Sequence, residues 1–300
     1  MPFVSVVIPT LNREEPLRNV LDYFLNSDKY PKYEIIVIDQ SDRHEPQTID
    51  FLSKAAHIIH YVRVSYKNLS KARNDGSRMA KGEIVLYVDD DIEPGINFIS
   101  SHVFPYVDPQ VMGVAGFTLC VEQDFKILSE LDEQARLSLL TKKQTYFQKD
   151  SGFQAFWAPG CNCSYRKDLI ERLGGFDENF MGLESMEDAE FSHRCSKNQA
   201  KICYNPSAYA LHRYISSGGC RDQIWSNSYI RAIAYNTNYF FLKVDASNMD
   251  RYKSLYRSFK GSISRYLTSG NGNFLSFFFI FIKGLWSSQK AYSLFLKRSK

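Results

Sequence analysis

The chain has 300 residues, of which 44% are hydrophobic and 23% are charged, and its formal net charge is +4. This composition is typical of a globular protein, and no internal repeat or low-complexity linker interrupts it. The length suits one large α/β domain with an appendage. No stretch reaches the ~20 apolar residues of a membrane span, so no transmembrane segment is predicted.

The net charge hides an asymmetry along the chain. Residues 243–300 carry 11 Lys or Arg and only two Asp, a charge of +9, whereas the remainder carries −5. A basic tail on an acidic body indicates an anionic partner for the tail. The chain begins directly in a predicted strand, so no signal peptide is expected. The six cysteines lack a C-x-x-C spacing and are expected to be reduced, as in a cytoplasmic protein.

The N-terminal third predicts a strand–helix–strand unit. Val4 to Ile8 is a continuous apolar run that ends at Pro9-Thr10, and Tyr33 to Ile38 is a second strand that ends at Asp39. Such a unit is expected to be parallel and right-handed. Apolar residues at helical spacing predict a helix between the strands, namely Leu17, Val20, Leu21, Phe24 and Leu25.

Further elements follow in order. Strands are predicted at 58–64, 84–88 and 111–120, with an edge strand at 201–204. Helices are predicted at 69–79, 96–104 and 221–242, and a short one begins near 166–170. The polar stretch 122–150 predicts a mobile loop or helical excursion near the active site.

The run Ile84–Val88 ends abruptly in three carboxylates, Asp89, Asp90 and Asp91. Ligands of open α/β sheets gather at the carboxyl ends of strands. Adjacent like charges repel one another, and a hard cation such as Mg²⁺ or Mn²⁺ would relieve that repulsion. The alternative is a solvated turn in which one Asp caps the following segment. The residue pattern alone leaves both alternatives open.

Six segments in this order resemble the family 2 glycosyltransferases of the GT-A fold, over about residues 3–215. They are Val4-Ser5-Val6-Val7-Ile8-Pro9-Thr10, Ile36-Val37-Ile38-Asp39, Ser70-Lys71-Ala72-Arg73-Asn74-Asp75-Gly76, Asp89-Asp90-Asp91, Gly174-Gly175-Phe176-Asp177-Glu178 and Glu187-Asp188. The resemblance implies an α/β, Rossmann-like GT-A domain with a mostly parallel sheet flanked by helices. We expect this catalytic domain at 1–220, with a donor half at 1–115 and an acceptor half at 116–220, and a helical extension at 221–300.

The resemblance also implies a nucleotide site. Pro9 and Thr10 at the end of the first strand would hold the donor nucleotide together with Asp39, whose carboxylate would accept a hydrogen bond from the base. Arg73 would fork onto phosphate oxygens or stack on the base. Without the resemblance, Asp39 is a turn residue and Arg73 a surface arginine.

For the acidic triad, the resemblance implies that Asp89 and Asp90 face the ribose and the diphosphate of the donor. Asp91 would bind the metal, either Mn²⁺ or Mg²⁺, and Asp89 is a second candidate ligand. His212 is a further candidate, although a lone histidine is weak evidence for a metal site. Which carboxylate touches the metal directly stays open.

A second acidic cluster, Glu187-Asp188, lies at the start of a predicted helix. Acids there complement the helix dipole, which is a sufficient structural explanation. The resemblance places the catalytic base here, because an inverting transfer needs a carboxylate to accept the proton of the acceptor hydroxyl. Asp188 is the expected base, and Glu187 is the alternative.

The tail combines an apolar block with basic flanks, since Phe274 to Ile282 and Trp286 stand among Lys283 and Lys290. Such a segment suits a helix lying on the anionic inner surface of a membrane. The alternative is a helix that packs on the catalytic domain or on a second copy in a homodimer.

The sequence therefore predicts an inverting, metal-dependent glycosyltransferase that uses a nucleotide-diphosphate sugar, with UDP favoured, and a saccharide or lipid-linked acceptor. No nucleic-acid partner is expected. A non-catalytic sugar-nucleotide-binding protein on the same fold is the alternative. A sugar-nucleotide pyrophosphorylase would need a glycine-rich loop after the first strand, and Pro9 to Arg13 contains no glycine.

Overall fold

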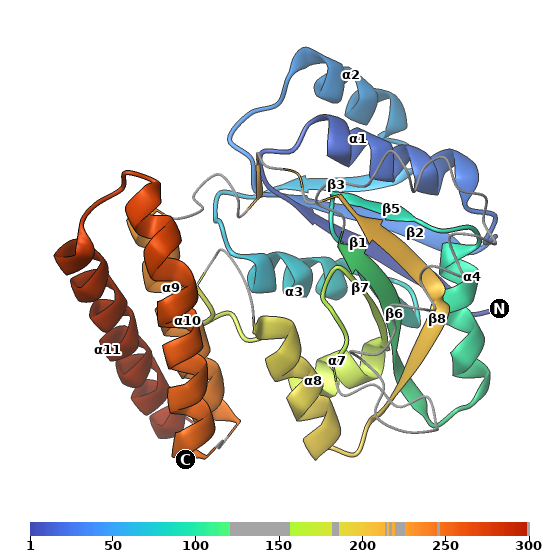
Figure 1. Cartoon of the computed structure of the whole chain (residues 1–300). Helices are drawn as coiled ribbons and strands as arrows, with labels where there is room; N and C mark the ends of the chain where they lie inside the picture. The colour runs from blue at the N-terminus through green and yellow to red at the C-terminus, as the bar shows by residue number, and fades with distance from the viewer. Residues whose placement is uncertain are drawn as a thin grey trace. The chain divides into compact units, whose positions relative to one another are not determined.

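The computed structural model describes residues 1–120, 157–181, 186–213, 215, 218–219, 226–244 and 247–298. The loop predicted at 122–150 and the first residues of the helix predicted at 221–242 lie outside these ranges. The chain divides into two compact units (Figure 1). The first unit holds residues 1–66, 72–175 and 192–218, and the second holds residues 67–71, 176–191 and 219–300.

Within the described residues, the first unit is built on an eight-stranded sheet with the order β3-β2-β1-β4-β7-β6-β8-β5. The strands are β1 Val4–Thr10, β2 Tyr33–Asp39, β3 Ile59–Arg63, β4 Ile84–Val88, β5 Ile92–Pro94, β6 Val111–Cys120, β7 Asn162–Arg166 and β8 Lys201–His212. Strands β1 to β4 pair in parallel with one another, and β6 pairs in parallel with β8. β7 and β5 are antiparallel to their neighbours. The expected mostly parallel sheet is confirmed.

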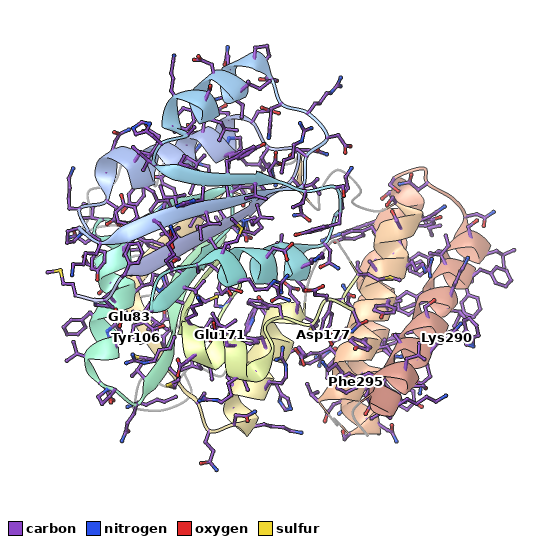
Figure 2. The ribbon with its side chains drawn as sticks, turned by 180° about the vertical axis from the view of Figure 1, so that it is seen from behind. Glu83, Tyr106, Glu171, Asp177, Lys290 and Phe295 are labelled. Atoms are coloured by element: carbon purple, nitrogen blue, oxygen red, sulfur yellow. The ribbon has the colours of Figure 1, made fainter. Side chains whose placement is uncertain are left out.

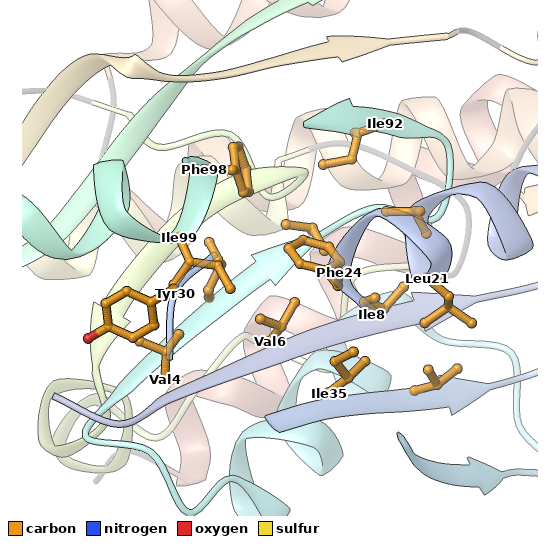
Figure 3. Close-up of a cluster of buried hydrophobic side chains, with 14 of the residues drawn as sticks. Val4, Val6, Ile8, Leu21, Phe24, Tyr30, Ile35, Ile92, Phe98 and Ile99 are labelled. Carbon is orange, nitrogen blue, oxygen red and sulfur yellow. The ribbon is translucent and has the colours of Figure 1, made fainter. Parts of the chain in front are cut away.

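Helices cover both faces of the parallel part of the sheet (Figure 1). The helices here are α1 Glu15–Asp22, α2 Pro46–Ala55, α3 Leu69–Met79, α4 Phe98–Val103 and α7 Lys167–Leu173, while α8 Glu187–Lys197 begins in the second unit and ends in the first. Figure 3 shows Val6 and Ile8 of β1 in one buried cluster with Leu21 and Phe24. Val7 points to the other face, where a side chain on Gly76 of α3 would lie only 2.3 Å from it. Burial on both faces explains the continuous apolar strands.

Several elements differ from the sequence prediction. The helix α2 was not predicted; it begins at Pro46, whose fixed φ and missing N–H suit a first helical position. β5 has only three residues, which is too short for a periodic signal. The edge strand predicted at 201–204 continues to His212. Its last residues, 210–212, are not at the edge of the sheet, because β5 pairs with them.

A buried amide side chain, that of Asn162, hydrogen-bonds to β6 and β8 where their pairing is irregular. The register of the two strands shifts after Gly116, and the Nδ2 of Asn162 donates to the carbonyls of Phe117 and Ala208, both at 3.0 Å. The Oδ1 of Asn162 therefore accepts, at 2.8 Å, from the Nε2–H of His102. The geometry leaves no room for a side chain at Gly116, since its Cβ would lie 2.2 Å from Asn162.

His102 makes the stability of this region depend on pH. Burial lowers the pKa of His102 to about 4, although the bond to Asn162 opposes the shift. An unfolded histidine titrates near 6.5, so the unfolded state binds more protons between pH 6.5 and 4. Through this residue we expect the free energy of unfolding to fall by about 3 kcal/mol as the pH drops across that window.

His102→Gln should flatten this part of the pH dependence, because glutamine stays neutral. Urea titrations at several pH values measure it, and His57→Gln at an exposed position is the matched control. Equal pH slopes for the wild type and His102→Gln would contradict the assignment.

The second unit contains three long helices, α9 Asn227–Lys243, α10 Asn248–Thr268 and α11 Phe274–Arg298. They share a buried cluster that includes Ile230, Tyr266, Phe277 and Phe281. Gly284 of α11 permits close packing, because a Cβ there would lie 2.6 Å from a backbone oxygen of α9. Among the described residues, no helix is both long and apolar enough to cross a membrane.

Candidate functional site

The parallel register brings three strand ends to one edge of the first unit's sheet. Thr10, the last residue of β1, pairs with Asp39, the last residue of β2. β4 lies on the other side of β1 and ends at Val88, directly before the acidic triad. Pro9 lies one position earlier and is buried. The structure thus brings together the predicted residues of the donor site at a carboxyl edge, where α/β proteins bind ligands.

Asp39 is completely buried and held by several donors. Its Oδ1 accepts from the backbone N–H of Ser41 at 2.8 Å, and its Oδ2 lies 2.9 Å from the Nε2 of His44 and accepts from the hydroxyl of Tyr61. Burial and the bond to Asp39 raise the pKa of Tyr61, so this hydroxyl stays a donor. His44 in turn contacts Glu14, at 3.0 Å. The sequence indicated Asp39 but none of the side chains that fix its orientation.

Arg73 is a buried residue, only 2% exposed, so the alternative of a surface arginine is wrong. Its Nη2 lies 3.2 Å from the Oδ1 of Asp89. The guanidinium lies against Gly160, where a Cβ would come within 2.6 Å of it. Glycine at this position therefore leaves the space that lets Arg73 reach the acidic triad from α3.

Asp90 and Asp91 are both buried, and a cation that the sequence analysis missed lies between them. The Nη2 of Arg13 is 3.1 Å from Asp91 Oδ2, and its Nε is 3.6 Å from Asp90 Oδ1. Thr10 Oγ1 donates to Asp90 Oδ2 at 2.6 Å. Burial and the charge of Asp91 nevertheless raise the pKa of Asp90 to about 7, because Arg13 and Thr10 offset only part of the cost.

A left-handed turn places Arg13. Asn12 has φ 51°, which redirects the chain after β1, and its backbone N–H donates to the Oγ of Ser41 at 2.7 Å. The position of Arg13 directly after Pro9-Thr10-Leu11-Asn12 is a signal that could have found it. The turn itself depends on the packing of residues distant in sequence.

His212 lies beside the triad because β5 and β8 form an antiparallel pair in which Ile92 faces His212. The Nε2 of His212 is 2.8 Å from Asp91 Oδ1. Asp89, Asp91 and His212 each offer a ligand atom, and these atoms lie within 4.8 Å of one another. Two carboxylates and one imidazole fit Mn²⁺, whereas Mg²⁺ prefers oxygen ligands throughout. The predicted cluster is therefore assembled, and its metal role stays a prediction.

Glu187 and Asp188 form the first turn of α8, as the sequence predicted, and belong to the second unit. Glu187 is buried and Asp188 is partly exposed. Met186 precedes them with φ 85°, and the backbone N–H of Ala189 donates to Asp188 Oδ1 at 2.7 Å. The other predicted site residues lie in the first unit, and the catalytic role of this pair stays a prediction.

The sequence model described as glycosyl transferase family 2 matches residues 5–174, which is more than half of the chain. The chain belongs to glycosyl transferase family 2. The family predicted from the sequence segments is thereby confirmed. One similar relative of this family 2 protein is the poly(ribitol-phosphate) β-N-acetylglucosaminyltransferase TarP of Staphylococcus aureus, 32% identical over 94 residues. The match covers 30% of this chain and 29% of TarP, so the chain spans less than a third of that relative's length.

Solved structures show the same fold. S. aureus TarS residues 1–349 in complex with UDP-GlcNAc has a TM-score of 0.61 at 18% identity, covering 94% of this chain and 81% of that one. The mannosyltransferase PcManGT of Pyrobaculum calidifontis, in complex with GDP-Man and Mn²⁺, has a TM-score of 0.56 at 17% identity, covering 98% and 81%. The GT-A fold expected for this family 2 protein is confirmed.

The assembled cluster predicts a binding site for Mn²⁺ that depends on Asp91. Asp91→Asn should lower Mn²⁺ affinity by more than about tenfold. The site would lose one carboxylate ligand, while the positive charge of Arg13 would remain nearby and repel the cation. Electron paramagnetic resonance of free Mn²⁺ measures the affinity without turnover. Asp108→Asn, which breaks an exposed ion pair with Lys201, is the matched control. Wild-type affinity in Asp91→Asn would exclude Asp91 as a ligand.

Proposed function

We propose that this family 2 protein is an inverting glycosyltransferase that moves a sugar from a nucleotide-diphosphate donor, with a UDP-sugar favoured. The observation that carries the proposal is the cluster of Asp89, Asp91 and His212 at the carboxyl edge of the sheet. A nucleotide diphosphate is the kind of ligand that needs a cation among carboxylates. The UDP-GlcNAc of the TarS complex supports the choice of nucleotide, and the Mn²⁺ of the PcManGT complex supports a metal.

In this proposal the first unit binds the donor. Thr10 and Asp39 hold the nucleotide at the ends of β1 and β2, with Pro9 shaping the end of β1, and Arg73 offers its guanidinium to the diphosphate. Asp89 and Asp90 face the ribose and diphosphate. Asp89, Asp91 and His212 would hold Mn²⁺ or Mg²⁺, which supplies Lewis-acid stabilisation of the leaving diphosphate when bound.

The acceptor hydroxyl needs a base, and we assign this role to Asp188, with Glu187 as the alternative. The carboxylate accepts the proton while the acceptor oxygen attacks the anomeric carbon. We propose a saccharide or lipid-linked saccharide as acceptor, and TarP, named for poly(ribitol-phosphate), supports a polymeric or anionic one. We also propose the functional division into a catalytic domain at 1–220 and an extension at 221–300.

A panel of nucleotide sugars, with and without Mn²⁺, tests the proposal by following donor hydrolysis and transfer to simple saccharides. Metal-dependent release of a nucleoside diphosphate is the expected result. Tight donor binding without turnover across the panel would favour the non-catalytic sugar-nucleotide-binding protein. Conversion of the nucleotide sugar and added pyrophosphate into a nucleoside triphosphate and a sugar 1-phosphate would favour a pyrophosphorylase.

Asp188→Asn should lower kcat for transfer by about 10² to 10⁴, because the amide has nearly the same shape and cannot accept the proton. Donor affinity should stay unchanged, as measured by calorimetry with UDP. If Asp188→Asn keeps near-normal turnover and Glu187→Gln loses it, the base is Glu187.

We further propose that α11 binds the anionic inner surface of a membrane. Its outer face exposes large apolar side chains, among them Leu275 at 63%, Phe279 at 68% and Trp286 at 68%. These positions recur at helical spacing, with the exposed Lys283 and Lys290 beside them. An apolar stripe flanked by cations complements lipid chains and acidic headgroups together.

The charge available for such a surface is smaller than the sequence count. Lys243 is internally paired, and Phe277 and Phe281 are buried in the cluster that the three helices share, so part of the apolar run packs within its own unit. Packing on the neighbouring helices α9 and α10 is a further role, outside the alternatives weighed from the sequence, which were a membrane surface and packing on the catalytic domain or on a second copy. The exposed stripe is what remains for an external partner.

Co-sedimentation with vesicles tests this surface. The full chain should bind anionic phosphatidylserine vesicles more tightly than neutral ones, and Phe279→Ser with Trp286→Ser should weaken binding by about tenfold or more, since two large apolar groups no longer enter the lipid. Phe104→Ser removes an exposed aromatic from the first unit and is the control. Binding that ignores lipid charge and survives the double substitution would overturn the proposal, as would a dimer that only the double substitution dissociates.

A further inference from the structure

Lys243, the last residue of α9, is the centre of a buried charge cluster in the second unit. Its Nζ lies 2.6 Å from Asp177 Oδ2 and 2.7 Å from Glu190 Oε1, and its side chain is 7% exposed. One ammonium thus serves two buried carboxylates. Asp177, a member of the cluster, and Phe295 on α11 are labelled in Figure 2.

Neighbouring groups complete the surroundings of the ammonium. The hydroxyl of Tyr239 donates to Asp177 Oδ2 at 3.0 Å, and the Nζ of Lys243 lies 4.6 Å from the ring centre of Phe295 on α11. Burial alone would raise the pKa of Asp177, but the charge of Lys243 and hydrogen bonds from Lys243 and Asn179 outweigh it and lower that pKa. Asp177 is therefore a carboxylate, and the pairing is ionic.

α9 also holds the chain between the two carboxylates. The Oδ1 of Asn236 accepts from the N–H of Met181 at 2.8 Å, and its Nδ2 donates to the carbonyl of the same residue at 3.1 Å. Phe180 packs edge-on against Tyr239, with ring centres 5.2 Å apart. The helix thus fixes residues 177 and 181 before α8 and residue 190 within it.

Glu190 stands on α8 two residues after Asp188 and three after Glu187. With 3.6 residues per turn, these three residues belong to one turn, so an anchor on Glu190 sets the rotation and the axial position of that turn. Exposed acids at a helix start have no such restraint. The ion pair therefore acts on the geometry of the turn that carries the acidic pair.

We propose that Lys243 is a positioning residue that holds the first turn of α8, and with it the base, through Glu190. This inference rests on the proposed function, in which Asp188 or Glu187 is that base. Lys243 does not touch the substrate in this proposal. It makes the helical extension a required part of the catalytic apparatus, in addition to any surface that α11 presents.

The test uses the full chain with Lys243→Met, which keeps the length of the side chain and removes its charge. We expect kcat for transfer to fall by about 10² if the base moves by about 1 Å. UDP affinity should change by less than about twofold, because the proposed nucleotide site lies in the first unit and Lys243 lies in the second. Lys243→Arg should recover most of the activity. Lys54→Met, which breaks the exposed pair of Lys54 with Asp50, is the control and should match the wild type.

Glu190→Gln is the second variant. It leaves the ion pair between Lys243 and Asp177 intact, with one charge of each sign, so the fold should be retained. It should lower kcat as Lys243→Met does, by a smaller factor, with the KM for the donor unchanged. A loss of thermal stability with unchanged kcat in both variants would reduce Lys243 to a structural ion pair and overturn the proposal.

A double substitution separates this inference from the assignment of the base. When Lys243→Met is added to Asp188→Asn, kcat should fall no further, because the misplaced group no longer acts. If the losses in kcat caused by Lys243→Met and Asp188→Asn multiply, Lys243 acts through another group than the base, and the proposal fails. If Asp188→Asn and Glu187→Gln both leave kcat unchanged, the proposed base is wrong, independently of the result for Lys243.

Discussion

The parallel pairing of β1 with β2 and β4 is the constraint on which the candidate site depends. Backbone hydrogen bonds fix the register of these strands, and close packing, such as that of Val7 against Gly76, makes a slip by one residue costly. The polar residues Thr10, Asp39 and Asp89 therefore follow the strands at one edge. No contact among those side chains is needed to bring them together, because the sheet does so.

The same edge concentrates negative charge, and the fold offsets it with cations drawn from separate elements. Arg13 follows β1, Arg73 lies on α3, and both guanidinium groups are buried against the triad. Burial and the neighbouring charge of Asp91 nevertheless raise the pKa of Asp90. Asp89 and Asp91, whose ligand atoms gather with that of His212, are suited to a cation and to a ligand that arrives with it.

Sequence reasoning found the elements whose signals are local. β4 and α3 have the predicted bounds. It missed α2 and β5, whose apolar content is too small for a clear period, and β7, which lies within an aromatic and glycine-rich stretch. For the site, the family segments marked the carboxylates. Among the groups that hold them, Arg13 and Tyr61 contact carboxylates that are distant in sequence. His44 lies only five residues after Asp39, but it belongs to none of the family segments.

Lys243 illustrates the limit of counting charges. In the sequence it is one of 11 basic residues of a tail that suggests an anionic partner, whereas in the structure its partners are two carboxylates of its own chain. The aromatic run of α11 divides in the same way, since Phe277 and Phe281 form the helical core while Phe279 and Trp286 face outward. Because Phe295 of α11 also lies over the Lys243 ammonium, one helix contributes both to the exposed stripe and to the buried cluster. A partner bound on the outer face of α11 would therefore contact a helix whose inner side lies against the Lys243 ammonium.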